Sequence, residues 1–296
     1  MTFFLYLCSE NPLWFINRMS KNSLLLVPSG GLANCMRAIV SAYHLCQMTD
    51  SSLQVVWFQG WGMHAAFSDI FEPLTKEKIA VREATVWDYL VNDRPRRHNL
   101  WLPYLPQQLY YGGGVIGELQ IASLQQQGFD FAQWLRGHRR YMSCHFEVVT
   151  PPRELYRDFF TPSEPVRAMI AAYQQQFGDD VIGMHIRRTD NIDSINKSPI
   201  ELFVEAGREE LTAHPDAKIF LATDSEDVKK EMRQHFGEHI ITSTAEATRD
   251  SVAGIRAGLA EMWTLSLTRK IYGSAGSSFS EMASWIGGNE LQILER

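Results

Sequence analysis

The sequence predicts an α/β protein with parallel sheets, and two observations carry that prediction. In the C-terminal half, short apolar runs alternate with segments whose apolar residues recur at helical spacing, which is the pattern of βαβ units. Near the N-terminus, an apolar run at 24–27 enters a glycine turn and leaves as a helical pattern over 32–48. The chain has 296 residues, which at roughly 150 residues per domain is enough for two such domains.

The expected elements are clear after residue 160 and hard to read between about 60 and 160. Pro199 suits the first turn of a helix, Gly237 suits a helix end, and Ser163 is a candidate N-cap. Three consecutive glycines predict a loop at 110–114. We expect strands at 24–27, 53–58, 181–186, 218–222, 239–242 and 270–273, and helices at 32–48, 165–177, 199–214, 225–236, 252–267 and 277–285.

The start of the chain is apolar but short. The run at 1–7 is too short to span a membrane and lacks the basic region of a signal peptide, so we expect no transmembrane segment. We place an N-terminal domain at 1–160, in which 1–20 form an extension, and a C-terminal domain at 161–296.

Composition excludes several classes of protein. The formal net charge is −6 and the isoelectric point is about 5.9, which argues against a nucleic-acid-binding protein. The four cysteines form no CxxC pair and have no zinc-ligand spacing with histidine, so we expect no metal site. Free thiols favour a reducing compartment, and we expect a cytoplasmic protein.

The polar residues that follow the strands indicate where a ligand binds. In open parallel sheets, ligands lie beyond the carboxyl ends of the strands. His185, Arg187, Arg188 and Asp190 end or follow the strand at 181–186. Two adjacent arginines there must meet an anion or a carboxylate, and arginine suits phosphate well. A diphosphate site and a structural Arg–Asp pair are both compatible with this pattern.

Two further strand ends allow a functional and a structural interpretation. Asp224 can bind a ribose or a base, or Asp224 or Ser225 can cap the helix that follows. The segment 273–278 is rich in glycine and serine and opens a helix. Ser277 and Ser278 can hold a phosphate there together with the helix N-terminus, or they can act as ordinary caps.

Four motifs in order resemble those of the fucosyltransferase superfamily. HIRRTD at 185–190 resembles its HxRRxD signature, and FLATDS at 220–225 resembles its second motif. The segment 262–285 resembles its third motif, and SGGLANCMRAI at 29–39 resembles its N-terminal glycine loop. The superfamily includes the α1,2- and α1,6-fucosyltransferases and, more distantly, the protein O-fucosyltransferases. The resemblance is strong over about 181–287 and at 24–45.

The resemblance implies a GT-B fold, in which two Rossmann-like domains with parallel sheets face a cleft. It also implies GDP-fucose as the donor substrate, a glycan or glycoconjugate acceptor held by the N-terminal domain, inversion at the anomeric carbon, and neither a cofactor nor an obligatory metal. No clear Asp-x-Asp motif stands near a strand end, which agrees with the last point.

The resemblance also implies roles for individual residues of the C-terminal half. Arg187 would contact the donor diphosphate and stabilise the charge that grows on the leaving β-phosphate. Arg188 would support the same site, and Asp224 would bind the nucleoside. His185 would contact the nucleoside or be a packed strand histidine. Glu261 stands near an aspartate that helps to bind the donor in some members, although a helical glutamate is often only solvated.

Phosphate and sugar contacts are implied for two more groups. Ser277 and Ser278 would receive phosphate oxygens. Gly30, Gly31 and Asn34 would approach the donor from the N-terminal domain, although this turn lacks both the G-x-G-x-x-G spacing and the lysine of a P-loop.

The base that accepts the proton of the attacking hydroxyl is not identified by the sequence. Asp190 is our candidate, with Asp193 and a carboxylate from 60–160 as alternatives. Asn191 stands where the α1,6-type enzymes tend to have lysine, which puts one phosphate contact and the donor identity in question.

Other patterns favour structural roles. Cys35 is expected to be a packing residue rather than a nucleophile, and the tryptophans are expected in the core or along an acceptor groove. The scattered histidines without ligand spacing are His64, His98, His138 and His145. An enzyme for another nucleotide sugar, a phosphohydrolase on the same scaffold and a non-catalytic nucleotide-sugar-binding protein remain as alternative functions.

Overall fold

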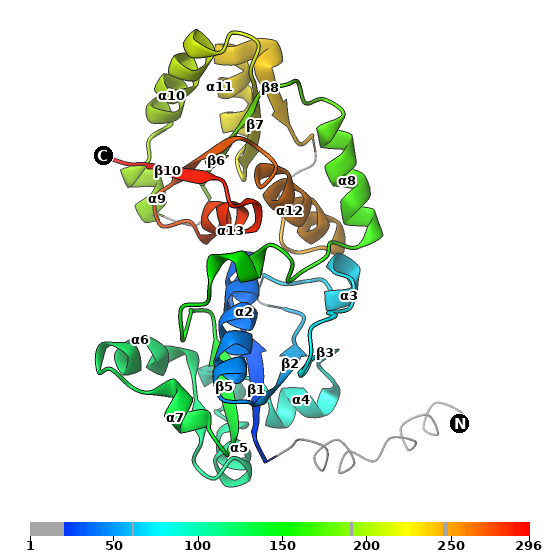
Figure 1. Cartoon of the computed structure of the whole chain (residues 1–296), viewed down its shortest axis with the longest axis vertical. Helices are drawn as coiled ribbons and strands as arrows, with labels where there is room; N and C mark the ends of the chain where they lie inside the picture. Colours follow the sequence, from blue (N-terminus) through cyan, green and yellow to red (C-terminus); the bar gives the residue numbers. More distant parts are fainter. Residues whose placement is uncertain (1–20, 61, 190–191, 245–247) are drawn as a thin grey trace. The chain divides into compact units, whose positions relative to one another are not determined.

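The protein forms two compact units, described here one at a time (Figure 1). The computed structural model describes residues 21–60, 62–189, 192–244 and 248–296. Of these residues, the N-terminal unit takes 21–30, 34–58 and 75–151, and the C-terminal unit takes those within 31–33, 59–74 and 152–296. We expected the domain boundary after residue 160. In the structure, the chain enters the C-terminal unit for the last time after Pro151.

The sheet of the N-terminal unit has five parallel strands in the order β3-β2-β1-β5-β4. Their bounds are β1 Ser23–Pro28, β2 Ser52–Trp57, β3 Ile79–Glu83, β4 Val115–Ile116 and β5 Arg139–Cys144. The helices of this unit are α2 Leu32–Met48, α4 Val86–Val91, α5 Tyr104–Tyr110, α6 Glu118–Gln126 and α7 Phe131–Leu135. The strand order reverses beside β1, so β1 and β5 flank the position at which such sheets bind ligands.

The sheet of the C-terminal unit is also parallel and has the order β10-β9-β6-β7-β8. Its strands are β6 Val181–Ile186, β7 Lys218–Thr223, β8 Ile240–Thr242, β9 Lys270–Ser274 and β10 Glu290–Leu294. Its helices are α3 Phe67–Ile70, α8 Glu164–Gln174, α9 Ile192–Lys197, α10 Ile200–Ala213, α11 Glu226–Phe236, α12 Val252–Leu265 and α13 Ser278–Gly287. Here the order reverses between β6 and β9, as it does in doubly wound nucleotide-binding sheets.

Strand β6 is buried on both faces, which explains its largely apolar sequence. Ile182, Met184 and Ile186 pack into a core with α10 and α11. Gly183 points to the other face, where an added Cβ would lie 2.8 Å from both Leu265 Cδ2 and Thr268 Oγ1. Glycine therefore lets α12 and the segment after it approach the middle of the sheet closely.

Most of the expected elements are confirmed. The strand at 181–186 and the helix at 32–48 have the predicted bounds, and the other expected strands and helices end within three residues of the prediction. In the expected loop at 110–114, Gly112 and Gly113 adopt φ of +55° and +76°. Ser163 stands at the N-cap of α8, but its hydroxyl donates to the Asp69 carbonyl instead of capping the helix. Within the described ranges, no helix combines the length and apolar character needed to cross a membrane.

Candidate functional site

The candidate site lies at the carboxyl ends of β6, β7 and β9, where the strand order of the C-terminal sheet reverses. The turn after β6 carries the two arginines, the turn after β7 carries Asp224, and the turn after β9 carries the serines. Ser274 joins two of these turns, because its hydroxyl accepts a hydrogen bond from the Arg187 N–H at 3.1 Å and lies 3.3 Å from the His185 carbonyl.

Asp224 holds the arginine turn in place. Its carboxylate accepts hydrogen bonds from the Arg188 N–H at 2.7 Å, from the Thr189 N–H at 3.3 Å and from the Thr189 hydroxyl at 2.7 Å. Ser225, not Asp224, caps α11, by accepting a hydrogen bond from the Val228 N–H. These contacts commit most of the acceptor capacity of the Asp224 carboxylate to the protein itself.

Arg188 is also tied to the backbone of its own turn. Its guanidinium donates to the Arg187 carbonyl at 2.7 Å and to the Ser198 carbonyl at 2.9 Å. Burial lowers the pKa of this guanidinium, against the opposing charges of Asp224, Glu201 and Glu231. Arg188 therefore shapes the turn and adds positive charge to it.

Arg187 is the arginine placed to meet an anion. Its Nε lies 3.4 Å from the Asp224 carboxylate, longer than the usual hydrogen-bond distance of about 2.9 Å. The side chain retains 17% of its accessible surface. The structural Arg–Asp pair thus exists between Arg187 and Asp224, and it leaves an accessible arginine beside the serine turn.

His185 is a packed, uncharged histidine. Its ring stacks on Phe279 with 4.6 Å between the ring centroids, and its Nδ1 lies 3.4 Å from the Ser277 hydroxyl. Burial, assisted by the positive charge of Arg187 and opposed by Asp224, lowers the pKa of His185 to about 3. A neutral imidazole cannot neutralise a phosphate, so His185 acts here by packing and by contacting the serine turn.

The serine turn after β9 leads into the N-terminus of α13. Ser277 occupies the N-cap position and makes no side-chain cap bond, and Ser278 is the first helical residue. The turn is fixed from α9, because the Ala275 N–H donates to Ser198 Oγ at 2.8 Å and Ser194 Oγ donates to the Ala275 carbonyl. A helix N-terminus at a topological switch point is suited to binding a phosphate.

Glu261 is buried on α12 and keeps only 9% of its surface accessible. Burial raises the pKa of this carboxyl to about 7, although the Lys229 charge and a hydrogen bond with Ser243 lower it and the carboxylates of Glu226 and Asp224 raise it further. The interpretation of Glu261 as a merely solvated helical residue is therefore wrong.

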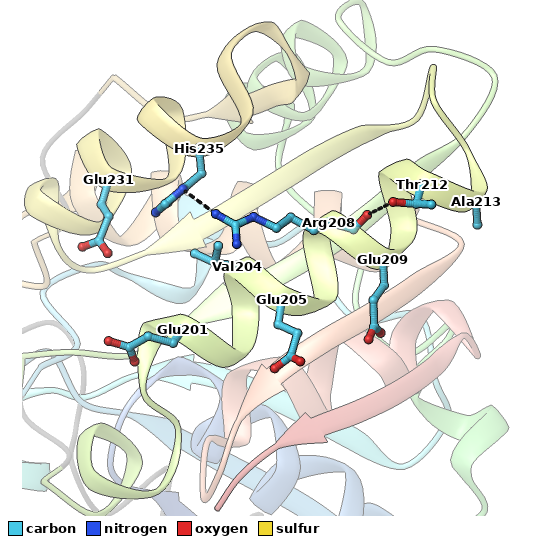
Figure 2. Close-up of a pocket in the computed structure, with 9 residues that line it drawn as sticks. All are labelled: Glu201, Val204, Glu205, Arg208, Glu209, Thr212, Ala213, Glu231 and His235. Atoms are coloured by element: carbon cyan, nitrogen blue, oxygen red, sulfur yellow. Dashed lines mark hydrogen bonds between the residues drawn. The ribbon is translucent and has the colours of Figure 1, made fainter.

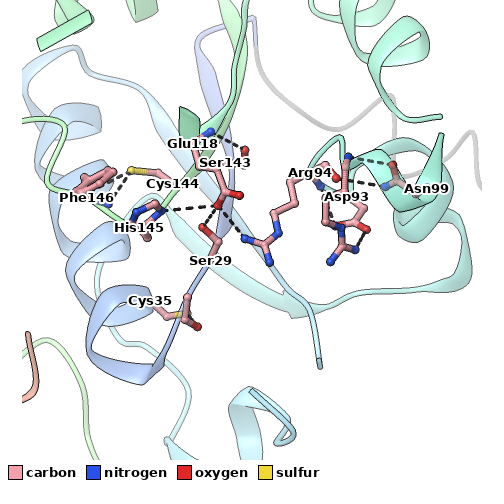
Figure 3. Close-up of polar contacts among 12 residues, drawn as sticks. Ser29, Cys35, Asp93, Arg94, Asn99, Glu118, Ser143, Cys144, His145 and Phe146 are labelled. Atoms are coloured by element: carbon pink, nitrogen blue, oxygen red, sulfur yellow. Dashed lines mark hydrogen bonds and ion pairs between the residues drawn. The ribbon is translucent and has the colours of Figure 1, made fainter. Parts of the chain in front are cut away.

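The carboxyl edge of the N-terminal sheet carries a separate polar cluster (Figure 3). Glu118 begins α6 just after β4, and its Oε2 accepts hydrogen bonds from Ser29 Oγ at 2.5 Å and from Arg94 Nη1 at 2.8 Å. His145 Nδ1 lies 3.7 Å from the same oxygen. Burial raises the pKa of Glu118, but its bonds with His145, Ser29 and Arg94 dominate and lower it to about 2. The sequence did not reveal this cluster.

The glycine turn after β1 belongs to the same edge. Gly30 has φ of +85°, a conformation that favours glycine, and an added Cβ would lie 3.0 Å from Asn34 Nδ2. Asn34 accepts a hydrogen bond from Arg37 Nη2 at 2.6 Å. Gly31 is the first residue that the contacts assign to the C-terminal unit. Cys35 is buried, and burial raises the pKa of its thiol to about 12, which agrees with a packing role.

Some predicted residues are not placed. Asp190 and Asn191 lie outside the described residues, and the side chain of Asp193 is likewise not described. In the described part of the chain, no group of three or more His, Cys, Asp or Glu residues could hold a metal ion.

A pocket of about 790 Å³ lies between α10 and α11 of the C-terminal unit (Figure 2). Four glutamates, Glu201, Glu205, Glu209 and Glu231, line it, together with Arg208 and His235. Because most of its charged side chains are carboxylates, this pocket does not suit a diphosphate.

The chain is similar to solved fucosyltransferase structures. The structure of the fucosyltransferase NodZ from Bradyrhizobium matches with 17% identity and a TM-score of 0.62, over 90% of this chain and 92% of that chain. POFUT1 in complex with GDP-fucose matches with 10% identity and a TM-score of 0.59, over 93% and 99%. A mutant of FUT1 from Arabidopsis thaliana in complex with GDP matches with 14% identity and a TM-score of 0.58, over 93% and 70%.

No protein-family model and no curated protein sequence match the chain. The likeness to solved structures covers nearly the whole chain and confirms the predicted α/β, GT-B-type fold with its two parallel sheets. The expected resemblance to fucosyltransferases holds at the level of the fold, which is what similarity at these identities establishes.

Proposed function

We propose that the protein is a glycosyltransferase that moves fucose from GDP-fucose to a hydroxyl of a glycan, with inversion and without a metal ion or another cofactor. The observation that supports it best is the junction of the arginine turn, Asp224 and the α13 N-terminus at the switch point of the C-terminal sheet. Solved relatives of the same fold include NodZ soaked with GDP-fucose and POFUT1 bound to GDP-fucose.

In this proposal the diphosphate binds at the arginine turn. Arg187 and the first N–H groups of α13, with Ser277 and Ser278, stabilise the charge that develops on the β-phosphate as fucose leaves. Arg188 and Asp224 act as positioning residues, because their side chains hold the backbone of the turn. These contacts support the proposal that the turn is preorganised to receive the leaving group.

The nucleoside end of the donor is assigned to Glu261, with Asp224 and His185 as the other sequence candidates. A guanine ring presents an N–H and an amino group side by side, and a carboxylate can accept both hydrogen bonds. Glu261 has the required carboxyl group, and a pKa of about 7 leaves it partly ionised at neutral pH.

The acceptor side is assigned to the N-terminal unit, with Gly30, Gly31 and Asn34 as candidate donor contacts. Glu118 is a poor candidate for the base, since a carboxylate whose pKa is about 2 binds a proton weakly. Asp190 remains our proposed base. A cytoplasmic location is part of the proposal, and a cleaved secretion signal on the native protein would contradict it.

Calorimetric titration with GDP, GDP-fucose, GDP-mannose and UDP-sugars tests the donor assignment. Wild type should bind the GDP compounds selectively without added metal. Arg187→Ala should weaken GDP binding by roughly ten- to a hundredfold, the worth of a hydrogen bond to a charged group. Arg208→Ala, at an exposed position of α10, removes the same charge from the same unit and should bind normally.

The outcomes separate the alternatives. Selective binding of UDP-sugars would favour another donor. Asn191, which stands where the α1,6-type enzymes tend to have lysine, is compatible with that result. A folded wild type that binds no nucleotide would refute the donor site altogether. If GDP-fucose binds, turnover with and without a glycan acceptor distinguishes a transferase from a phosphohydrolase and from a binding protein.

A further inference from the structure

An apolar surface of the N-terminal unit is exposed on α4, α5 and the segment between Asn99 and Tyr104. α4 and α5 are in contact, and both are labelled in Figure 1. The large apolar side chains exposed there are Val86, Trp87, Tyr89, Leu90, Leu100, Trp101, Leu102, Tyr104, Leu105, Leu109 and Tyr110. We call these eleven residues the α4–α5 surface. Single exposed apolar residues are common, but this number on neighbouring elements marks an interaction surface.

In helix α5 the usual pattern of a surface helix is reversed, because a polar side chain is buried and leucine side chains are exposed. Gln107, its central polar residue, is 1% exposed and donates a hydrogen bond to the Asp93 carbonyl at 2.8 Å. Leu105 and Leu109 are instead 70% and 84% exposed. A helix in water normally buries its apolar face, so the reversed pattern leaves apolar side chains open to contact from outside the unit.

Some cations lie among the apolar side chains of the surface, although the chain carries a net charge of −6. Arg94 pairs with Glu118 and Arg96 pairs with Asp93, so among the described residues Arg97 is the arginine of the segment 94–117 that meets no carboxylate. Arg97 and His98 are exposed beside Leu100. Arg139 lies over the ring of Tyr110, 5.0 Å from its centroid. Apolar and aromatic side chains are thus combined with cations along one segment.

We propose that the α4–α5 surface binds the face of a lipid bilayer that contains anionic lipids. Leucine side chains can enter the acyl region, while tryptophan and tyrosine prefer the level of the headgroups. Arg97 and His98 would meet lipid phosphates, which gives the charge complementarity. A symmetric contact with a second copy suits the surface less well, because it would bring the exposed Arg97 of both copies together. The proposal does not depend on the donor assigned above.

Vesicle co-sedimentation of the full chain tests this proposal. Wild type should sediment with vesicles of phosphatidylcholine and phosphatidylglycerol, and weakly with phosphatidylcholine alone. Leu105→Asp/Leu109→Asp should reduce binding about tenfold or more, since burying one leucine side chain is already worth about that factor. Leu119→Asp is the matched control, because Leu119 is 84% exposed on α6, outside the surface, and this variant should bind as wild type does.

Two further variants test the role of charge and of the N-terminal residues in vesicle binding. Arg97→Glu should lose the preference for anionic vesicles while the protein stays folded, because Arg97 is exposed. A chain that starts at Met19 should still bind, since the α4–α5 surface is intact. The proposal fails if wild type ignores both kinds of vesicle, or if the truncation abolishes binding that the double variant retains. A dimer in solution that the double variant dissociates would assign the surface to a second copy and overturn the proposal.

Discussion

The buried carboxyl of Glu261 should make the stability of the protein fall as the pH rises. Its pKa is raised from 4.5 to about 7, chiefly by burial. Between these two values the unfolded chain loses the proton while the folded protein keeps it, so the folded state binds more protons and the free energy of unfolding decreases with pH. The full effect is about 3 kcal/mol at 1.36 kcal/mol per pKa unit.

The substitution Glu261→Gln removes this titration and keeps the shape of the side chain. Relative to the variant, wild type should lose about 3 kcal/mol of stability between pH 4.5 and 8 and change little outside that window. Urea denaturation of both proteins across this range measures the difference. Glu205→Gln, at an exposed position of α10, is the control for removing a carboxylate without burial.

Parallel stability curves for wild type and Glu261→Gln would refute the reasoning, because they would mean that Glu261 titrates alike in both states. A wild type that gains stability with pH relative to the variant would reverse the sign and point to a pKa lowered by Lys229. If guanine binds the ionised carboxylate, GDP binding below pH 7 should also release a proton. Calorimetry in buffers of different ionisation enthalpy detects that release.

Three other predictions concern packing, acid stability and thiol reactivity. Gly254→Ala should destabilise the protein by more than 1 kcal/mol in thermal unfolding, because its Cβ would lie 2.2 Å from the Thr248 carbonyl oxygen; Gly258→Ala, in open space on the same helix, should stabilise it by about 0.5–1 kcal/mol. Glu118 has a pKa lowered to about 2, so the stability it contributes should be lost as the pH falls below 4.5, and Glu118→Gln should flatten the acid limb of the denaturation curve. Cys35 should react with iodoacetamide only as fast as the protein unfolds, since burial raises the pKa of its thiol to about 12; rapid labelling of the native protein would contradict this.

The C-terminal unit was readable from the sequence because its central strands are buried on both faces. Such strands stand out as continuous apolar runs between helices, as at β6 and β7. β10 was missed because it is an edge strand with mostly exposed side chains. In the N-terminal unit, β4 has only two residues, and its helices α4, α5 and α7 are too short for a helical period to show.

The site was readable only in part, because several roles depend on contacts distant in sequence. Position after a strand was enough to select Arg187, Arg188 and Asp224. Position could not show that the Asp224 carboxylate accepts a hydrogen bond from the N–H of Arg188, 36 residues earlier in the chain. This contact is what makes Asp224 a residue that fixes the turn. Glu118 was missed for a related reason, since its partners Ser29 and Arg94 come from separate segments.

The balance of charge at the two switch points explains why the C-terminal unit is the better candidate for binding an anion. At the N-terminal edge, the Glu118 carboxylate forms an ion pair with Arg94, so the positive charge of Arg94 is balanced within the protein. At the C-terminal edge, Arg187 and Arg188 both lie beside Asp224, Glu201 and Glu231 also oppose the charge of Arg188, and the α13 N-terminus adds partial positive charge. Positive charge at a partly buried edge is stabilised by a bound anion. On this reasoning Asp224→Asn, in a variant that circular dichroism shows to be folded, should tighten the binding of inorganic phosphate, and unchanged or weaker binding measured by calorimetry would contradict it.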